Sequence, residues 1–195
     1  MSVRTAPKEP REQSLGYLRT AELGQYSYYG GLLLTDVAGV PKTFHYAEPV
    51  TPTRIQQIIY GYSLERYCRV DIVASALIAQ VPEPPALFVV SDGFLLHAEK
   101  HTDRPVIALS ASNESPFSEI GQYQHVNERE ILLQATPAGG PLRVTMTHKH
   151  RKLDQVVPIL CEMGQVISPL EPLERVALAL EEIGGELKAT LGRAA

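Results

Sequence analysis

Two unbroken apolar runs, separated by a short segment, constrain the fold of this chain more than any other feature. The runs are ALFVVSD at residues 86–92 and PVIALS at residues 105–110, with GFLLHAEKHTD between them. Strands that are covered on both faces of a parallel sheet lose the polar alternation of half-exposed strands. We therefore predict two neighbouring parallel strands in the centre of a sheet, joined by a short crossover helix.

Two β-hairpins are predicted on either side of this pair. Residues 26–36 alternate as a strand does and are followed by the turn VAGV and a second strand at residues 41–49. In the first strand, the adjacent Gly30 and Gly31 predict a bulge or a close backbone approach. The second hairpin is expected within residues 130–149, with PAGG as its turn.

Helices fill much of the remaining chain. Residues 53–80 carry apolar side chains at helical spacing, with a slip in phase at residues 61–63 that predicts two helical segments or one kinked helix. A last helix is expected from Ser168 to Ile183, ended by Gly184 and Gly185. The fold class is thus α/β or α+β: a small mixed sheet with two β-hairpins, a central parallel strand pair and flanking helices.

Length and composition favour a single globular domain. The chain has 195 residues, and we expect a flexible tail at residues 1–14 and one domain at 15–195, with a sub-boundary in the polar loop 111–128. Only two cysteines occur, Cys68 and Cys161, far apart in sequence, which favours reduced thiols and a cytoplasmic location. The net charge of −4 and the lack of a long apolar run predict no membrane partner and make nucleic acid an unlikely one.

A pair of aspartates at strand ends is the main candidate for catalysis. Asp36 ends the first strand and Asp92 ends the first parallel strand, and carboxylate oxygens are the ligands that Mg²⁺ prefers. The order of hairpin, long helix, strand with a terminal Asp, helix and strand resembles a ribonuclease H-type layout, which implies metal-dependent phosphodiester hydrolysis. The sequence departs from that layout because it shows no clear third antiparallel strand, and its long helix offers only Glu65 and Asp71. The alternative is that Asp36 begins a turn and Asp92 caps a helix.

Three further groups were weighed as sites. The strand ends near Asp92, Gly93 and Ser110 could bind a small ligand, because α/β folds place ligands there. The histidine pairs are expected to be packed or exposed and not zinc ligands, since neither has a third ligand nearby in sequence; they are His97 with His101 and His148 with His150. The basic stretch at residues 143–152 could contact phosphate, but a solvated strand end is the favoured explanation. Its basic members are Arg143, Lys149, Arg151 and Lys152.

The clearest bias in composition is a gathering of tyrosines. Seven of the nine lie within residues 26–67, interspersed with arginines. Tyrosine and arginine are enriched at protein interfaces, although an aromatic core is the competing explanation. The predicted interface residues are Arg54, Tyr60, Tyr62, Arg66, Tyr67 and Arg69.

No complete catalytic motif is present, and these patterns together favour a binding protein over an enzyme. The main expectation is a cytoplasmic protein that binds a protein partner, its own copy or a small ligand, without a cofactor. The alternative is a metal-dependent phosphodiesterase or nuclease that uses Asp36 and Asp92 with Mg²⁺ as its only cofactor.

Overall fold

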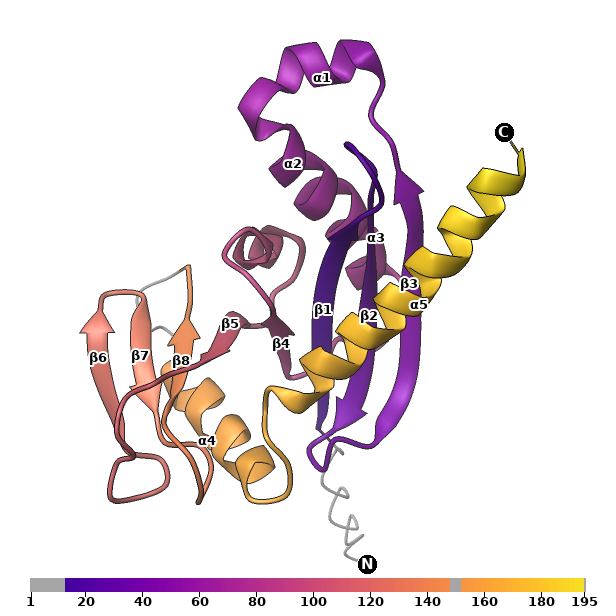
Figure 1. Cartoon of the computed structure of the whole chain (residues 1–195). Coiled ribbons are helices and arrows are strands. Elements are labelled where there is room, and N and C mark those ends of the chain that lie inside the picture. Colours follow the sequence, from indigo (N-terminus) through magenta and orange to yellow (C-terminus); the bar gives the residue numbers. More distant parts are fainter. Residues whose placement is uncertain (1–12, 148–151, 195) are drawn as a thin grey trace, which may run out of the picture.

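The computed structural model describes residues 13–147 and 152–194, and a mixed eight-stranded sheet forms its centre (Figure 1). The strand order is β3-β2-β1-β4-β5-β8-β7-β6. The α/β class, the two hairpins and the flanking helices predicted from the sequence are confirmed. The strands are β1 (Ser14–Glu22), β2 (Tyr28–Asp36), β3 (Pro41–Val50), β4 (Leu87–Val90), β5 (Val106–Ala111), β6 (Tyr123–Asn127), β7 (Glu130–Leu133) and β8 (Leu142–Thr145).

Strand β1 is the element that the sequence analysis missed. It lies between the first hairpin and the parallel pair, antiparallel to β2 and parallel to β4. The third antiparallel strand, whose absence separated this sequence from the ribonuclease H-type layout, therefore exists. It escaped notice because four consecutive residues, 15–18, are buried on alternating faces, so the segment shows no polar alternation. The predicted tail at residues 1–14 lies outside the described residues except for Gln13 and Ser14, and Ser14 already belongs to β1.

The parallel pair and the second hairpin are both found where the sequence places them. Strands β4 and β5 pair in parallel, and all four residues of β4 are buried. Between them the chain forms η3, a 3₁₀ helix (Leu95–His101). Strands β7 and β8 form the antiparallel second hairpin, and β6, which was not predicted, adds an exposed edge strand to β7.

Helices cover both faces of the sheet and create two separate apolar layers. On one face lie α4 (Leu153–Gly164) and α5 (Glu171–Ala194), and α5 crosses in front of β1 and β2 in Figure 1. On the other face, residues 54–79 form one bent helical region, as the phase slip predicted. This region consists of α1 (Arg54–Tyr60), the 3₁₀ helix η1 (Gly61–Ser63), α2 (Leu64–Arg66), the π-helical η2 (Tyr67–Ala74) and α3 (Ser75–Ala79).

Close packing explains two glycines that the sequence singled out, Gly30 and Gly184. A Cβ atom at Gly30 would lie 2.8 Å from Val73 Cγ1 and 2.9 Å from a backbone oxygen, so the predicted close backbone approach is confirmed. The prediction that Gly184 and Gly185 end the last helix is wrong, because α5 continues to Ala194. At Gly184 the missing side chain makes room for Tyr29, whose hydroxyl donates to the carbonyl oxygen of Leu180 at 2.8 Å.

Candidate functional site

The two aspartates of the predicted metal site lie at opposite ends of the sheet. Asp36 pairs with Ser14, the first residue of β1, whereas Asp92 follows β4 two residues beyond Val90, which pairs with Leu18. Asp92 is therefore level with Thr20 of β1, two residues beyond Leu18. Ser14 and Thr20 are six residues apart on the strand, which at about 3.3 Å per residue separates them by about 20 Å. Asp36 and Asp92 therefore cannot share a metal ion, and the prediction that they do is wrong.

Asp36 has the structural role that the sequence allowed as the alternative. Its carboxylate accepts a hydrogen bond from the backbone N–H of Val40 at 2.9 Å, and its carbonyl oxygen accepts from Gly39. These bonds close the turn between β2 and β3. Gly39 has a φ of +78°, which this turn needs and a glycine adopts without strain.

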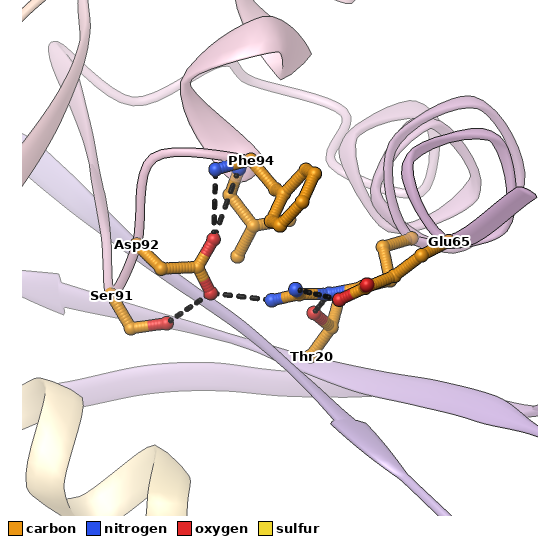
Figure 2. Close-up of polar contacts among 7 residues, drawn as sticks. Thr20, Glu65, Ser91, Asp92 and Phe94 are labelled. Carbon is orange, nitrogen blue, oxygen red and sulfur yellow. Dashed lines mark hydrogen bonds and ion pairs between the residues drawn. The ribbon is translucent and has the colours of Figure 1, made fainter. Parts of the chain in front are cut away.

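At the other end of the sheet, the strand register brings Asp92 beside Thr20. Leu18 and Val90 are partners in the parallel ladder of β1 and β4, and both contribute to the apolar layer under the helices of residues 54–79. Because side chains alternate between faces, the residues two positions further along each strand return to that same face. The side chains of Thr20 and Asp92 thus point toward the helical region, where Glu65 also lies (Figure 2).

Arg69 connects these residues. Its Nε donates to Thr20 Oγ1 at 2.8 Å, its Nη1 to Glu65 Oε1 at 2.8 Å, and its Nη2 to Asp92 Oδ2. The guanidinium also lies 5.3 Å from the ring centre of Phe94, a cation–π contact. Its side chain is only 13% exposed, so the three bonds form away from most of the solvent. We call Thr20, Glu65, Arg69 and Asp92 the Arg69 cluster.

Asp92 uses its second oxygen for the backbone of the next helix. Oδ1 accepts from the N–H groups of Phe94 at 3.0 Å and Leu95 at 3.3 Å, while the Ser91 hydroxyl donates to Oδ2 at 3.4 Å (Figure 2). Asp92 is thus both a helix cap and a member of the Arg69 cluster. Its carboxylate joins β4, η2 and the start of η3.

The residues predicted beside Asp92 as a ligand site stay at this edge of the sheet. Gly93 is exposed directly after Asp92, and Ser110 is exposed two residues beyond Ala108, the β5 partner of Val90. The three residues thus lie at one edge of the sheet, and their role in binding a ligand stays a prediction. No sequence signal pointed to Thr20, and the spacing of Glu65 and Arg69, four residues apart on a helix, was the one clue to their ion pair.

The predicted tyrosine and arginine interface does not form one continuous set. Tyr60 and Tyr67 stack on each other with ring centres 4.0 Å apart, and the hydrogen bond to Tyr67 raises the pKa of Tyr60. Tyr62 is fully exposed in the helical region of residues 54–79, and Arg54 and Arg66 in the same region are also exposed. Arg69 is withdrawn from the surface into its cluster.

The other predicted candidates are scattered. His97 is exposed, and His101 Nε2 lies 3.3 Å from Asp71 Oδ1, which also pairs with Lys100. Burial raises the pKa of Asp71, but Lys100 and His101 outweigh it and lower the pKa below the usual value of 3.8. Arg143 pairs with Glu130, and Lys152 donates to the carbonyl oxygen of Asp103. His148, Lys149, His150 and Arg151 lie outside the described residues.

The Arg69 cluster does not fit a resident magnesium ion. Mg²⁺ needs several oxygen ligands around one point. Here the oxygens of Thr20, Glu65 and Asp92 already accept hydrogen bonds from one guanidinium. Among residues 13–147 and 152–194, no group of three or more His, Cys, Asp or Glu side chains could hold a metal ion.

Comparison with known proteins shows a likeness in fold to solved structures of endonuclease V. No protein-family model matches the chain, and a search of curated proteins finds no match. Among solved structures, human endonuclease V superposes with a TM-score of 0.65 at 13% identity, covering 90% of this chain and 86% of that one. Endonuclease V from Streptomyces avermitilis gives a TM-score of 0.62 at 16% identity, covering 92% and 84%. Endonuclease V from Ciona intestinalis, in complex with DNA containing an inosine, gives 0.59 at 12% identity, covering 91% and 87%.

These likenesses establish the fold and correct the main functional expectation. The sequence favoured a protein-binding module with nucleic acid as an unlikely partner, yet the structural neighbours are nucleases, one of them bound to DNA. The expectation of a protein-binding module is therefore wrong. No helix in the described part of the chain is long and apolar enough to cross a membrane.

Proposed function

We propose that this protein acts on nucleic acid, and that it does so at the edge of the sheet where β1 and β4 end. The observation that carries this proposal is the Arg69 cluster. It is a polar site built from three elements, at the strand ends of a fold shared with endonuclease V. The carboxyl ends of parallel strands are where α/β folds bind their ligands. The carboxylates available to such a site are Glu65 and Asp92, and Asp36 has no part in it.

An exposed aromatic ring beside the cluster supports contact with bases. Phe94 is 43% exposed although it lies only four residues beyond the end of the buried strand β4. Aromatic side chains at such positions stack on unpaired bases, at a gain of about 1 to 3 kcal/mol per base. Because the chain carries a net charge of −4, this binding depends on local contacts, and we expect a shallow dependence on salt concentration.

A cytoplasmic location belongs to the same proposal. It is supported by Cys68 and Cys161, which are both free thiols. Burial raises the pKa of both thiols, so neither is activated for disulfide exchange.

The test is a binding and cleavage assay with labelled oligonucleotides. Single-stranded and double-stranded DNA and RNA, each with and without an inosine, would be titrated with the full chain and followed by fluorescence anisotropy. The same samples would then be run on a denaturing gel for strand cleavage. We expect binding to at least one of these nucleic acids, weakened on the order of tenfold by Phe94→Ala through the loss of one stacking contact.

Tyr46 provides the matched control for Phe94. It is an exposed aromatic residue at 53%, but its β2 partner Gly31 packs near Leu180, on the face covered by α5. Tyr46→Ala should therefore leave the affinity unchanged. If none of the nucleic acids binds, or if the two variants lose affinity equally, the proposal is wrong.

A further inference from the structure

We infer that Arg69 takes the place of a divalent cation in this site, so that the chain engages nucleic acid without a resident metal ion. The claim that the chain engages nucleic acid rests on the proposed function. The claim that Arg69 occupies the place of a divalent cation does not depend on it. The ribonuclease H-type layout seen in the sequence leads one to look for metal-binding carboxylates at the ends of these strands. The chain has two carboxylates there, and both are bound to an arginine.

The geometry of the contacts is that of a filled cation site. Three oxygens from three different elements converge on one positive group: Thr20 Oγ1 from β1, Glu65 Oε1 from α2 and Asp92 Oδ2 from the segment after β4. All three guanidinium nitrogens are engaged, and the side chain is 13% exposed. The planar guanidinium presents its donors in a rigid fork that matches carboxylate oxygens, which suits it to this position.

The charges show why a cation is excluded while Arg69 is present. Glu65 and Asp92 contribute two negative charges, and Arg69 balances one of them within hydrogen-bonding distance. A divalent ion at the same oxygens would lie next to the guanidinium and be repelled by it. The local helix geometry also holds Arg69 in place, because it belongs to η2, whose residues Cys68 and Val70 on either side of it are fully buried.

Removal of the guanidinium should turn the same residues into a cation site. Three oxygens would then face one point, from the hydroxyl group of Thr20 and the carboxylates of Glu65 and Asp92. Oxygen ligands of this kind suit Mg²⁺ and Mn²⁺. Arg69→Met is the variant of choice, because methionine fills similar space without a charge or a hydrogen-bond donor.

The experiment measures Mn²⁺ binding by electron paramagnetic resonance and isothermal titration calorimetry on the full chain. We expect the unaltered protein to show no stoichiometric Mn²⁺ at this site, and Arg69→Met to bind one Mn²⁺ at least about tenfold more tightly. Adding Asp92→Asn to Arg69→Met should abolish the gain. Arg66→Met, a matched change at an exposed arginine three residues earlier, should behave as the unaltered protein does.

Two measurements need no variant and keep the inference open to refutation if Arg69→Met does not fold. Oligonucleotide binding by the unaltered protein should be the same in EDTA and in Mg²⁺. Stoichiometric Mn²⁺ in the unaltered protein that is lost in Asp92→Asn would overturn the inference, as would nucleic-acid binding that requires Mg²⁺. A folded Arg69→Met that gains no Mn²⁺ would overturn it too. Failure to bind any nucleic acid would instead refute the proposed function and leave the Mn²⁺ results to decide the metal part.

Discussion

The two ends of the central strands each carry one aspartate, and the surroundings of the two differ completely. The carboxylate of Asp36 accepts from the backbone of its own turn, at Val40 four residues further along. Asp92 bonds to η3 and, through Arg69, to α2 and β1 as well. The same residue type at a strand end thus closes a turn in one place and joins separate elements in the other. What distinguishes a site from a turn here is the number of distant elements that meet at the carboxylate.

The largest effect on stability should follow the replacement of Arg69. Arg69→Met leaves Glu65 and Asp92 facing each other without a balancing charge, and we expect the free energy of unfolding to fall by about 2 to 3 kcal/mol. This value allows for the partial exposure of both carboxylates, at 45% and 35%. Urea denaturation followed by circular dichroism measures it.

A specific rescue makes the Arg69 result more informative. Millimolar Mn²⁺ should restore part of the stability of Arg69→Met, because a ligand that binds only the native state stabilises it. Arg66→Met serves as the control and should lose little. If Arg66→Met and Arg69→Met lower the free energy of unfolding equally, the contacts of Arg69 stabilise the protein no more than those of an exposed arginine. That result would contradict the structural role of the Arg69 cluster.

Replacement of Asp92 should have the next largest effect. Asp92→Ala removes one bond to Arg69 and the cap on the backbone of η3, with an expected loss of about 1 to 2 kcal/mol. Asp92→Asn keeps an oxygen for the N–H of Phe94 and should lose less, so the difference between the two variants isolates the cap. Thermal unfolding of the two variants side by side would measure it, and identical melting temperatures would contradict the capping role.

Asp36 should matter less than Asp92. Asp36→Ala removes one hydrogen bond to the N–H of Val40 in an accessible turn, and we expect a loss of about 0.5 to 1 kcal/mol. Nucleic-acid affinity should not change, because Asp36 lies at the far end of β2. A loss of affinity in Asp36→Ala as large as the loss expected in Phe94→Ala would contradict this.

Asp71 offers a smaller effect that separates structural ion pairs from the site. It contacts Lys100 and His101 and so joins η2 to η3, as Asp92 does, but lies outside the Arg69 cluster. Its pKa is lowered in the folded chain, so its contribution to stability is present above the unfolded value of 3.8 and is lost as pH falls below it. Asp71→Asn should therefore weaken the fall in stability between about pH 5 and about pH 2.5. A pH profile unchanged by Asp71→Asn would contradict this.

The fold could be predicted from the sequence wherever burial leaves a periodic pattern. The parallel pair and both hairpins follow from apolar runs and from alternation. Strand β1 was missed because its residues are buried on both faces and follow directly after a polar segment. The end of α5 was misplaced because Gly184 accommodates Tyr29 and does not stop the helix.

The site could be predicted only in part. Asp92 stood out because it follows an apolar run. Its partners in the Arg69 cluster are distant in sequence: Arg69 is 23 positions away and Thr20 is 72 positions away. Whether residues so distant in sequence come together depends on the strand order. Because β1 was not predicted, Thr20 could not be identified as a member of the site. Asp36 looked equivalent to Asp92 because a sequence shows that a residue ends a strand but not which end of the sheet that strand faces.

The central place of β1 also has a consequence for how the chain folds. Among the described strands β1 is the first along the chain, yet it pairs with β4 through residues as distant as Leu18 and Val90. The first hairpin can form locally, but the centre of the sheet must wait until the long helical region and β4 are available. Contacts of such long sequence separation slow folding. During synthesis, the side of β1 that pairs with β4 should therefore lack its hydrogen-bonding partner until β4 has left the ribosome. The pairing of β1 with β4 should then form after the pairing of β1 with β2.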